Sequence, residues 1–349
     1  MKKNNRTTAA ASPATLAVRA YVATLAILYG LGAAQHPDAG TDVFPFLRIN
    51  YDAREGGLAG AMIGFPAHAG GASANPAILG YIGKKQAVVG YRHMILDVWG
   101  GMASYSMPIA STGTWSVNIL DFSAGTVEEV IEENGLPVET GVTWRDNAVS
   151  GGLSWGRIVW EQLALGASLR GVHHTIGSSA TSYSASAVTA DLGVQYRLFK
   201  DRFVAGIAVR NLGFLTSSYG ADVKYALPVT LGAGMSYSPR YVDNMRIGLD
   251  LEKPVRDGLQ IEPGLEISVF QKILLLRLGY PFSDRDVEEA FNVFRGTPTE
   301  GYQKSFWRTL CLGIGLQTAT GTVDLNIDAA IEFHTDVNPS PLLTVSVGF

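Results

Sequence analysis

Apolar residues recur at every second position along most of the chain beyond residue 85. In the stretch VTLGAGMSY, Val229, Leu231 and Met235 share one side, while Thr230 and Ser236 share the other. The same alternation recurs in LALGASLR, MRIGLDLE, LCLGIGLQ and DLNIDAAIEF. Successive side chains leave opposite faces of a β-strand, so a period of two predicts strands rather than helices. The sequence therefore predicts an all-β fold over this region.

The apolar side of these strands is almost free of charged residues, and the other side is small or charged. A soluble antiparallel sheet with one solvated face is the alternative interpretation. Only 17% of all residues are charged, against about a quarter in soluble domains. A charge on a lipid-facing strand near mid-membrane costs about 2–4 kcal/mol. The pattern therefore favours transmembrane strands, with lipid outside and a polar lumen inside.

Fourteen segments are long enough to cross a bilayer as tilted strands, and an even number suits a bacterial barrel. Long connections, at 123–145, 175–183, 213–225 and 281–306, follow odd-numbered segments, and short ones follow even-numbered segments. This parity is typical of barrels with long external loops and short periplasmic turns. We therefore predict a 14-stranded antiparallel transmembrane β-barrel. Its predicted strands lie near 86–96, 100–109, 113–122, 146–157, 161–174, 184–198, 202–212, 226–239, 244–254, 258–270, 272–280, 307–318, 322–333 and 341–349.

The last predicted strand has to pair with the first, because unpaired strand-edge amides cost several kcal/mol each in hydrocarbon. It places Leu343, Val345, Val347 and Phe349 on the lipid side. The aromatic end at Phe349 looks like the C-terminal signal that barrel-assembly machinery reads. That machinery and the lipid of the outer membrane are therefore expected partners.

Residues 1–34 have the pattern of a cleaved export signal. Basic residues precede the 12-residue apolar run AYVATLAILYGL, and Gly32 and Ala34 form a small-x-small cleavage pattern. The apolar run is too short for a stable membrane-spanning helix, although a retained anchor is the alternative. Without this segment the formal net charge is −8, which argues against a nucleic-acid partner.

Residues 35–85 do not alternate and are rich in glycine and alanine. Glycine permits close backbone packing, and Asn75-Pro76 starts a turn. An irregular segment cannot cross lipid, but it can fold inside a barrel whose lumen groups satisfy its backbone. We therefore predict a signal peptide at 1–34, an N-terminal hatch or plug at 35–85 and a barrel at 86–349. A periplasmic tail is the alternative for the second region.

The stretch DAREGGLAGAMIGFPAHAGGASANPAILG, residues 52–80, resembles the start of the PorV/PorQ family and of the related FadL-type transporters. The stretches at 185–198, 206–214 and 226–237 also resemble PorV/PorQ members. The sequence departs from these relatives at GFPAHAGG, 64–71, where they carry acidic residues, so an acidic role there is in doubt. The residues that match the hatch motif are Ala53, Arg54, Gly60, Ala61, Asn75, Pro76, Ala77 and Leu79.

The resemblance implies a FadL-like barrel with an N-terminal hatch in the bacterial outer membrane. PorV-like members serve type IX secretion as shuttle or attachment components. We therefore expect a PorV/PorQ-type component of protein secretion or cell-surface attachment, with secretion-system proteins or secreted cargo as partners. The alternative is a FadL-like channel that binds long-chain fatty acids or other hydrophobic small molecules in its barrel. A structural outer-membrane protein without transport is the third hypothesis.

Charged residues on the predicted lumen side form the remaining candidate site. One interpretation is a salt-bridged interior that holds the hatch, and the other is a path for a substrate. These residues are Arg170, Arg210, Arg246, Asp250, Glu252, Arg277, Asp324, Asp328 and Glu332.

No motif in the chain indicates catalysis, a metal or a cofactor, so we expect no enzyme. His173 and His174 point to opposite faces of a strand and cannot share a metal. The run GLSWG at 152–156 has the G-x-S-x-G spacing, but it lies within the predicted strand 146–157 and not at the strand-to-helix turn of a nucleophile elbow. There is no phosphate-binding loop. The single cysteine, Cys311, excludes an intrachain disulfide. The acidic run 286–294 is either a short amphipathic docking helix or a solvated loop.

Overall fold

The computed structural model describes residues 39–66, 68–220, 225–242, 244–283, 286, 309–334 and 338–349. The predicted export signal lies outside the described residues, and so does the acidic run 286–294 apart from Asp286. Among the described residues, no helix has both the length and the apolar character needed to cross a membrane.

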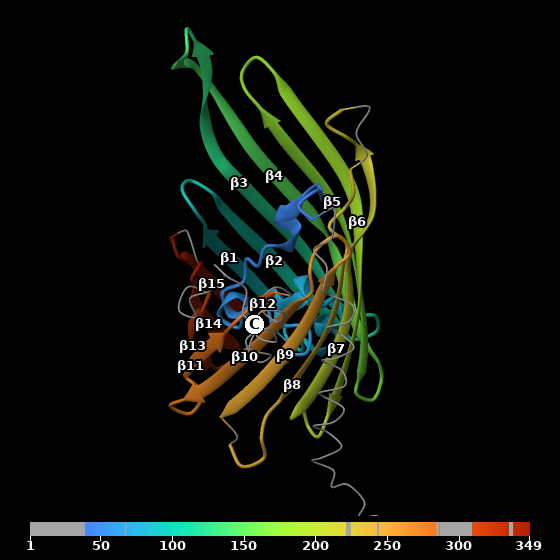
Figure 1. Cartoon of the computed structure of the whole chain (residues 1–349). Coiled ribbons are helices and arrows are strands. Elements are labelled where there is room, and N and C mark those ends of the chain that lie inside the picture. Colours follow the sequence, from blue (N-terminus) through green and yellow to red (C-terminus); the bar gives the residue numbers. More distant parts are fainter. Residues whose placement is uncertain are drawn as a thin grey trace, which may run out of the picture.

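Fourteen antiparallel strands form one closed barrel (Figure 1), which confirms the predicted fold. Each strand pairs with its neighbour in sequence, β11 pairs with β13, and β15 pairs with β1 to close the sheet. A two-residue strand, β12 (Phe282–Ser283), adds to β10. The long strands are β1 (Gln86–His93), β2 (Trp99–Ile109), β3 (Gly113–Glu133), β4 (Leu136–Trp160), β5 (Leu163–Gly177), β6 (Ser182–Leu198), β7 (Phe203–Ser217), β8 (Thr230–Tyr237), β9 (Met245–Pro254), β10 (Gln260–Val269), β11 (Leu274–Gly279), β13 (Cys311–Thr320), β14 (Val323–Glu332) and β15 (Ser340–Gly348).

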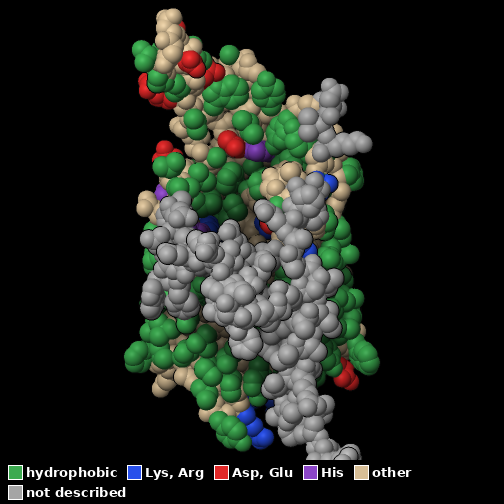
Figure 2. All heavy atoms as spheres, viewed as in Figure 1, with side chains coloured by type: hydrophobic (Ala, Val, Ile, Leu, Met, Phe, Trp, Pro, Cys, Tyr) green, Lys and Arg blue, Asp and Glu red, His purple; other side chains and the backbone are tan. Residues whose placement is uncertain are grey.

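The outer and inner faces of the barrel follow the predicted alternation. Val89, Leu169 and Ile207 on the outer face are each about 60% exposed, whereas Ser106 and Thr189 on the inner face are fully buried. Figure 2 shows the apolar side chains on the wall of the barrel. A wall of this kind is stable only against lipid, because exposed apolar surface of this extent is rare on soluble monomers.

The segment predicted as a long loop at 123–145 is a hairpin, and this part of the prediction is wrong. β3 and β4 continue to a turn at Asn134 and Gly135, which both have positive φ. Asn-Gly with positive φ at both positions is the preferred two-residue hairpin turn. The predicted loop at 175–183 is likewise shortened, since β5 runs to Gly177 and β6 starts at Ser182.

Residues 126–144, here called the arm, project beyond the rest of the barrel (Figure 1). The last pair between β2 and β3 is Trp99 with Ser123, and the last pair between β4 and β5 is Arg145 with Gly177. Both edges of the arm are therefore free of a neighbouring strand. We call this end of the barrel the arm end and the opposite end the turn end.

Residues 43–82 lie inside the barrel (Figure 1) and are called the inner segment. The segment bonds to opposite sides of the wall: Ala53 N donates to Thr344 Oγ1, and Ile63 N donates to Asp250. Its backbone needs space at the wall, because a Cβ at Gly166 would lie 2.2 Å from Ala77 N. Its short helices are η1 (Pro45–Arg48), α2 (Ala53–Gly57), η2 (Ala69–Ser73) and η3 (Pro76–Tyr81).

Asn75 shows why the Asn-Pro motif holds the inner segment in place. Its side chain is fully buried, donates to Ile63 O and Val194 O, and accepts from Ala77 N. A buried polar group that loses its partner costs about 1–3 kcal/mol. We expect Asn75→Leu to lower the free energy of unfolding by at least about 2 kcal/mol.

Thermal unfolding in detergent measures this effect, with protease cleavage of the inner segment as the readout. Asn326→Leu is the control, because half-buried Asn326 bonds only to Ser346 Oγ. Equal melting temperatures for the wild type and Asn75→Leu would contradict the assigned role of the motif.

Candidate hydrophobic ligand site

The lumen at the arm end is lined by apolar side chains, which differs from the polar lumen expected there. Here the wall packs against the start of the inner segment, so burial favours apolar residues. Phe44 is fully buried, and the Phe46 ring stacks on Phe122 with a centroid distance of 5.6 Å. This upper cluster consists of Val43, Phe44, Phe46, Leu47, Ala148, Val172, Ala185, Ala187 and Leu227, with Leu120, Phe122 and Leu215 packed against it.

One polar group, the His174 imidazole, lies within the upper cluster. Its two nitrogens bond to Asp146 and to the Tyr219 hydroxyl. Its ring centroid lies 6.1 Å from that of Phe44 and 6.2 Å from that of Phe46. Burial, followed by the charge of Asp146, raises the pKa of the Tyr219 hydroxyl. The upper cluster therefore encloses one linked set of polar groups, His174 with Asp146 and Tyr219, in an otherwise apolar wall.

A β-bulge extends the apolar inner surface from the barrel into the arm. Ser123 pairs with Asn147 and Thr126 pairs with Arg145, so β3 carries one additional residue, next to Gly125 at positive φ. The additional residue reverses which positions of β3 face inward. Below the bulge, even-numbered residues face inward, and above it odd-numbered residues do.

The inner side of the arm carries most of its apolar residues together with Glu129 and Glu133, while its outer side carries Glu128, Glu132 and Glu139. Directly opposite residues of an antiparallel pair share a face, and Val127 pairs with Trp144 while Ile131 pairs with Val138. On the other face, Glu128 pairs with Thr143. Figure 2 shows acidic side chains at the tip of the arm. The inner apolar residues of the arm are Val127, Ile131, Leu136, Val138, Val142 and Trp144.

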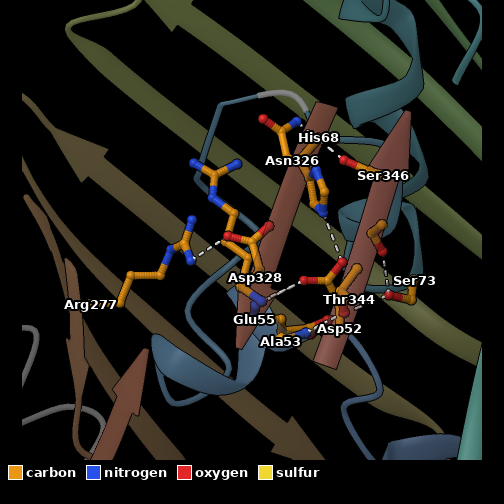
Figure 3. Close-up of polar contacts among 12 residues, drawn as sticks. Asp52, Ala53, Glu55, His68, Ser73, Arg277, Asn326, Asp328, Thr344 and Ser346 are labelled. Atoms are coloured by element: carbon orange, nitrogen blue, oxygen red, sulfur yellow. Dashed lines mark hydrogen bonds and ion pairs between the residues drawn. The ribbon is translucent and has the colours of Figure 1, made fainter. Parts of the chain in front are cut away.

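Deeper in the barrel, a buried network of ion pairs connects wall strands β10, β11 and β14 and joins them to Arg54 of the inner segment. The Arg54 guanidinium bonds to Glu266 at 2.9 Å, and Arg277 bonds to Glu266 at 2.9 Å and to Asp328 at 2.7 Å. Figure 3 shows Arg277 and Asp328 beside the inner segment. The Arg277 side chain is 1% exposed, so these charges are separated from bulk water.

Asp52 and His68 form a second polar contact, within the inner segment (Figure 3). The Asp52 carboxylate is fully buried, accepts from Arg54 N and Glu55 N, and lies 2.7 Å from His68 Nε2. Burial acts to raise the pKa of Asp52, but His68 and the backbone donors outweigh it and lower the pKa to about 2. Burial, followed by the charge of Asp52, raises the pKa of Glu55 well above its usual range.

Most of the predicted lumen charges meet a partner inside the barrel. Asp324 is the exception, because it pairs with Lys84 near the turn end and its side chain is 33% exposed. The other contacts are Arg170 with Asp191, Arg210 with Glu252, Glu332 with Arg92, Arg246 with Ser236 and the Asp201 carbonyl, and Asp250 with Ile63 N. The arrangement favours an ion-paired interior that holds the inner segment over a free charged path.

Sequence reasoning missed Glu266, Asp52, His68 and His174 as functional positions. His174 carried a signal as one of two adjacent histidines, and His68 carried one as the single titratable residue in the run GFPAHAGG. The hatch-motif residues Ala53, Arg54, Gly60, Ala61, Asn75, Pro76, Ala77 and Leu79 all lie in the inner segment. His173 points outward to Ser186, opposite to His174.

A small cavity between η2 and strands β2–β6 lies below the upper cluster. Its volume is about 60 Å³, and Met102, Ser150 and Arg170 contribute to its lining. An apolar cavity that holds benzene is about 150 Å³. The inner segment must therefore move before a hydrophobic molecule can pass along this side of the lumen.

Comparisons with known proteins give similarity in structure alone. No family model and no curated protein matches the sequence. The Pseudomonas putida toluene transporter TodX superposes with a TM-score of 0.61 at 12% identity, over 86% of this chain and 98% of that one. The CymD monoaromatic hydrocarbon channel gives a TM-score of 0.53 at 12% identity, over 88% and 98%. This chain shares the barrel fold of these two channels.

The shared barrel fold agrees with the part of the predicted resemblance that concerns the architecture. The similarity spans 98% of TodX and 98% of CymD. At 12% identity the likeness carries the architecture and not the ligand. The type IX secretion assignment receives no support from these structures.

Proposed function

We propose that this protein is an outer-membrane channel for hydrophobic small molecules, closed by the inner segment as a hatch. The observation that carries the proposal is the series of apolar residues on the inner surface, which runs from Leu136 and Ile131 on the arm to Phe122, Phe46 and Phe44. An apolar molecule gains about 25 cal/mol for each Å² of apolar surface that leaves water. The surface therefore guides such a molecule from outside the barrel to the hatch.

The nature of the site favours small hydrocarbons and amphiphiles as the ligand class. TodX is a toluene transporter and CymD is a monoaromatic hydrocarbon channel, and this chain shares their fold. The linked polar groups of His174, Asp146 and Tyr219 lie beside Phe44 and Phe46. A molecule with one polar end and an apolar body satisfies both features of the upper cluster.

Binding of a fluorescent apolar probe to the purified protein in detergent tests the arm surface. Ile131→Asp places a charge on the inner apolar side, and we expect its affinity for the probe to fall about tenfold, equivalent to 1.4 kcal/mol. Val130→Asp is the matched control, since Val130 neighbours Ile131 but faces the acidic outer side. Equal affinities of the two variants would contradict the proposed path.

A component of protein secretion, of PorV/PorQ type, is the second candidate. The exposed acidic outer side of the arm favours it, because Glu128, Glu132 and Glu139 lie there beside free strand edges. Shortening the arm to a turn after Ser123 separates the two candidates. Reduced export of secreted proteins with normal uptake of apolar probes would support the second candidate and contradict the first.

A further inference from the structure

A cavity of about 520 Å³ lies on the outside of the barrel, at the foot of the arm. Its lining includes His93, Asp97, Trp99, Ser123, Arg145 and Asn147. Trp99 pairs with both His93 and Ser123, and Ser123 pairs with Asn147, so these four residues form one row across β1–β4. The row faces outward, because Arg92 and Ala148, adjacent to it in sequence, are buried on the inner face.

This row lies where the apolar outer face ends. On β3 the outward apolar residues stop at Ile119, which is 51% exposed, and Asp121 and Ser123 follow. The Trp99 ring stacks on Tyr91 at a centroid distance of 6.2 Å. Aromatic residues gather at the level of lipid headgroups. The cavity therefore opens at headgroup height, on the arm end of the membrane.

The walls of the cavity are shaped by the bulge and by the β1–β2 turn. Gly125 lies so close to this turn that a Cβ there would be 2.8 Å from the Asp97 Cβ. The turn thus stands against the bulge and closes one side of the cavity. Across the described part of the chain, the side chains of Asp97, Arg145 and Asn147 form no hydrogen bond or ion pair, so they are free to bind a ligand.

The chemistry of the free groups matches a phosphorylated sugar. Arginine binds phosphate with two parallel N–H donors. The exposed Arg145 side chain lines the cavity. Asn147 and Ser123 can form hydrogen bonds with sugar hydroxyls, and the Asp97 carboxylate can accept hydrogen bonds from them. The face of the Trp99 ring offers an apolar surface to the ring carbons of a sugar.

We infer that this cavity binds the phosphorylated saccharide headgroup of an outer-leaflet glycolipid, whose acyl chains lie along the apolar wall below. The inference rests on the proposed outer-membrane location. It differs from the proposed transport function, because the ligand stays outside the barrel. Bound lipid would contact β1 to β4 together and so stabilise the foot of the arm.

Native mass spectrometry of the purified protein in a non-ionic detergent tests the inference, with diphosphorylated lipid A as the probe. We expect Arg145→Gln and Trp99→Leu each to reduce the retained lipid about tenfold. Arg157→Gln is the matched control, because Arg157 lies exposed on β4 at the turn end. Electrophoresis of unheated and heated samples verifies that each variant forms a folded barrel.

Three results would overturn the inference. Equal losses for Arg145→Gln and Arg157→Gln would show unspecific attraction of charge. Equal retention of phosphatidylglycerol would remove the role of the sugar, and equal affinity for free glucosamine phosphate would make a soluble saccharide the ligand. A variant that loses lipid A but still binds the apolar probe supports the lipid-binding inference independently of the transport function. Failure of the wild type to insert into liposomes would instead contradict the proposed outer-membrane function.

Discussion

Replacement of Arg277 by methionine is expected to lower the free energy of unfolding by about 3–5 kcal/mol. The substitution removes the cation between Glu266 and Asp328, both of which lie inside the barrel. Asp328 is then a buried carboxylate without a cation, whereas Glu266 keeps Arg54. Breaking a buried ion pair from one side is costly, because the remaining charge has lost its compensation.

Thermal unfolding in detergent, read by the mobility of unheated and heated samples, measures this loss. Lys84→Met is the control, since the Lys84–Asp324 pair is exposed and exposed pairs contribute about 0–1 kcal/mol. The double variant Arg277→Met, Asp328→Leu should recover part of the stability. If Arg277→Met melts like Lys84→Met, the ion-paired interior does not hold the inner segment.

Replacement of Phe44 and Phe46 by alanine is expected to open the hatch at the arm end. Truncation of a buried phenylalanine costs about 3–5 kcal/mol, and both rings lie in the upper cluster. Apolar cavities of sufficient size stay dry and bind small aromatic molecules. We therefore expect the variant to be less stable without ligand and to regain stability when a monoaromatic hydrocarbon is added.

Two measurements examine this variant: the melting temperature with and without hydrocarbon, and uptake of an apolar probe by cells that carry it. Uptake should rise about tenfold if the two rings contribute at least 1.4 kcal/mol to closure. Phe270→Ala is the control, because Phe270 is 74% exposed. Unchanged uptake with a lowered melting temperature would show that the rings stabilise the barrel without closing it.

The two candidate functions depend on different sides of the same arm. Its inner side continues the apolar surface of the upper cluster, and its outer side presents carboxylates to the medium. Because the bulge next to Gly125 decides which residues of β3 lie on which side, this one irregularity separates a ligand path from a protein-facing surface. Variants on the two sides can therefore be tested independently.

Local chemistry in the sequence predicted much of the architecture. Closure of the sheet follows from the requirement that every backbone amide in lipid be paired, and strand alternation follows from lipid on one face and the lumen on the other. The arm was also accessible to sequence reasoning, since Asn134-Gly135 is a strong hairpin signal.

The sequence by itself determined the barrel, its closure and a glycine-rich segment that does not alternate, because each depends on neighbours along the chain. Only the tertiary structure decided that Arg54 meets Glu266, 212 positions away, and that the lumen is apolar at the arm end. Such contacts depend on which strands the closed sheet brings opposite the inner segment. The bulge likewise reverses the faces of β3 through the register with β4, which no pattern within β3 alone specifies.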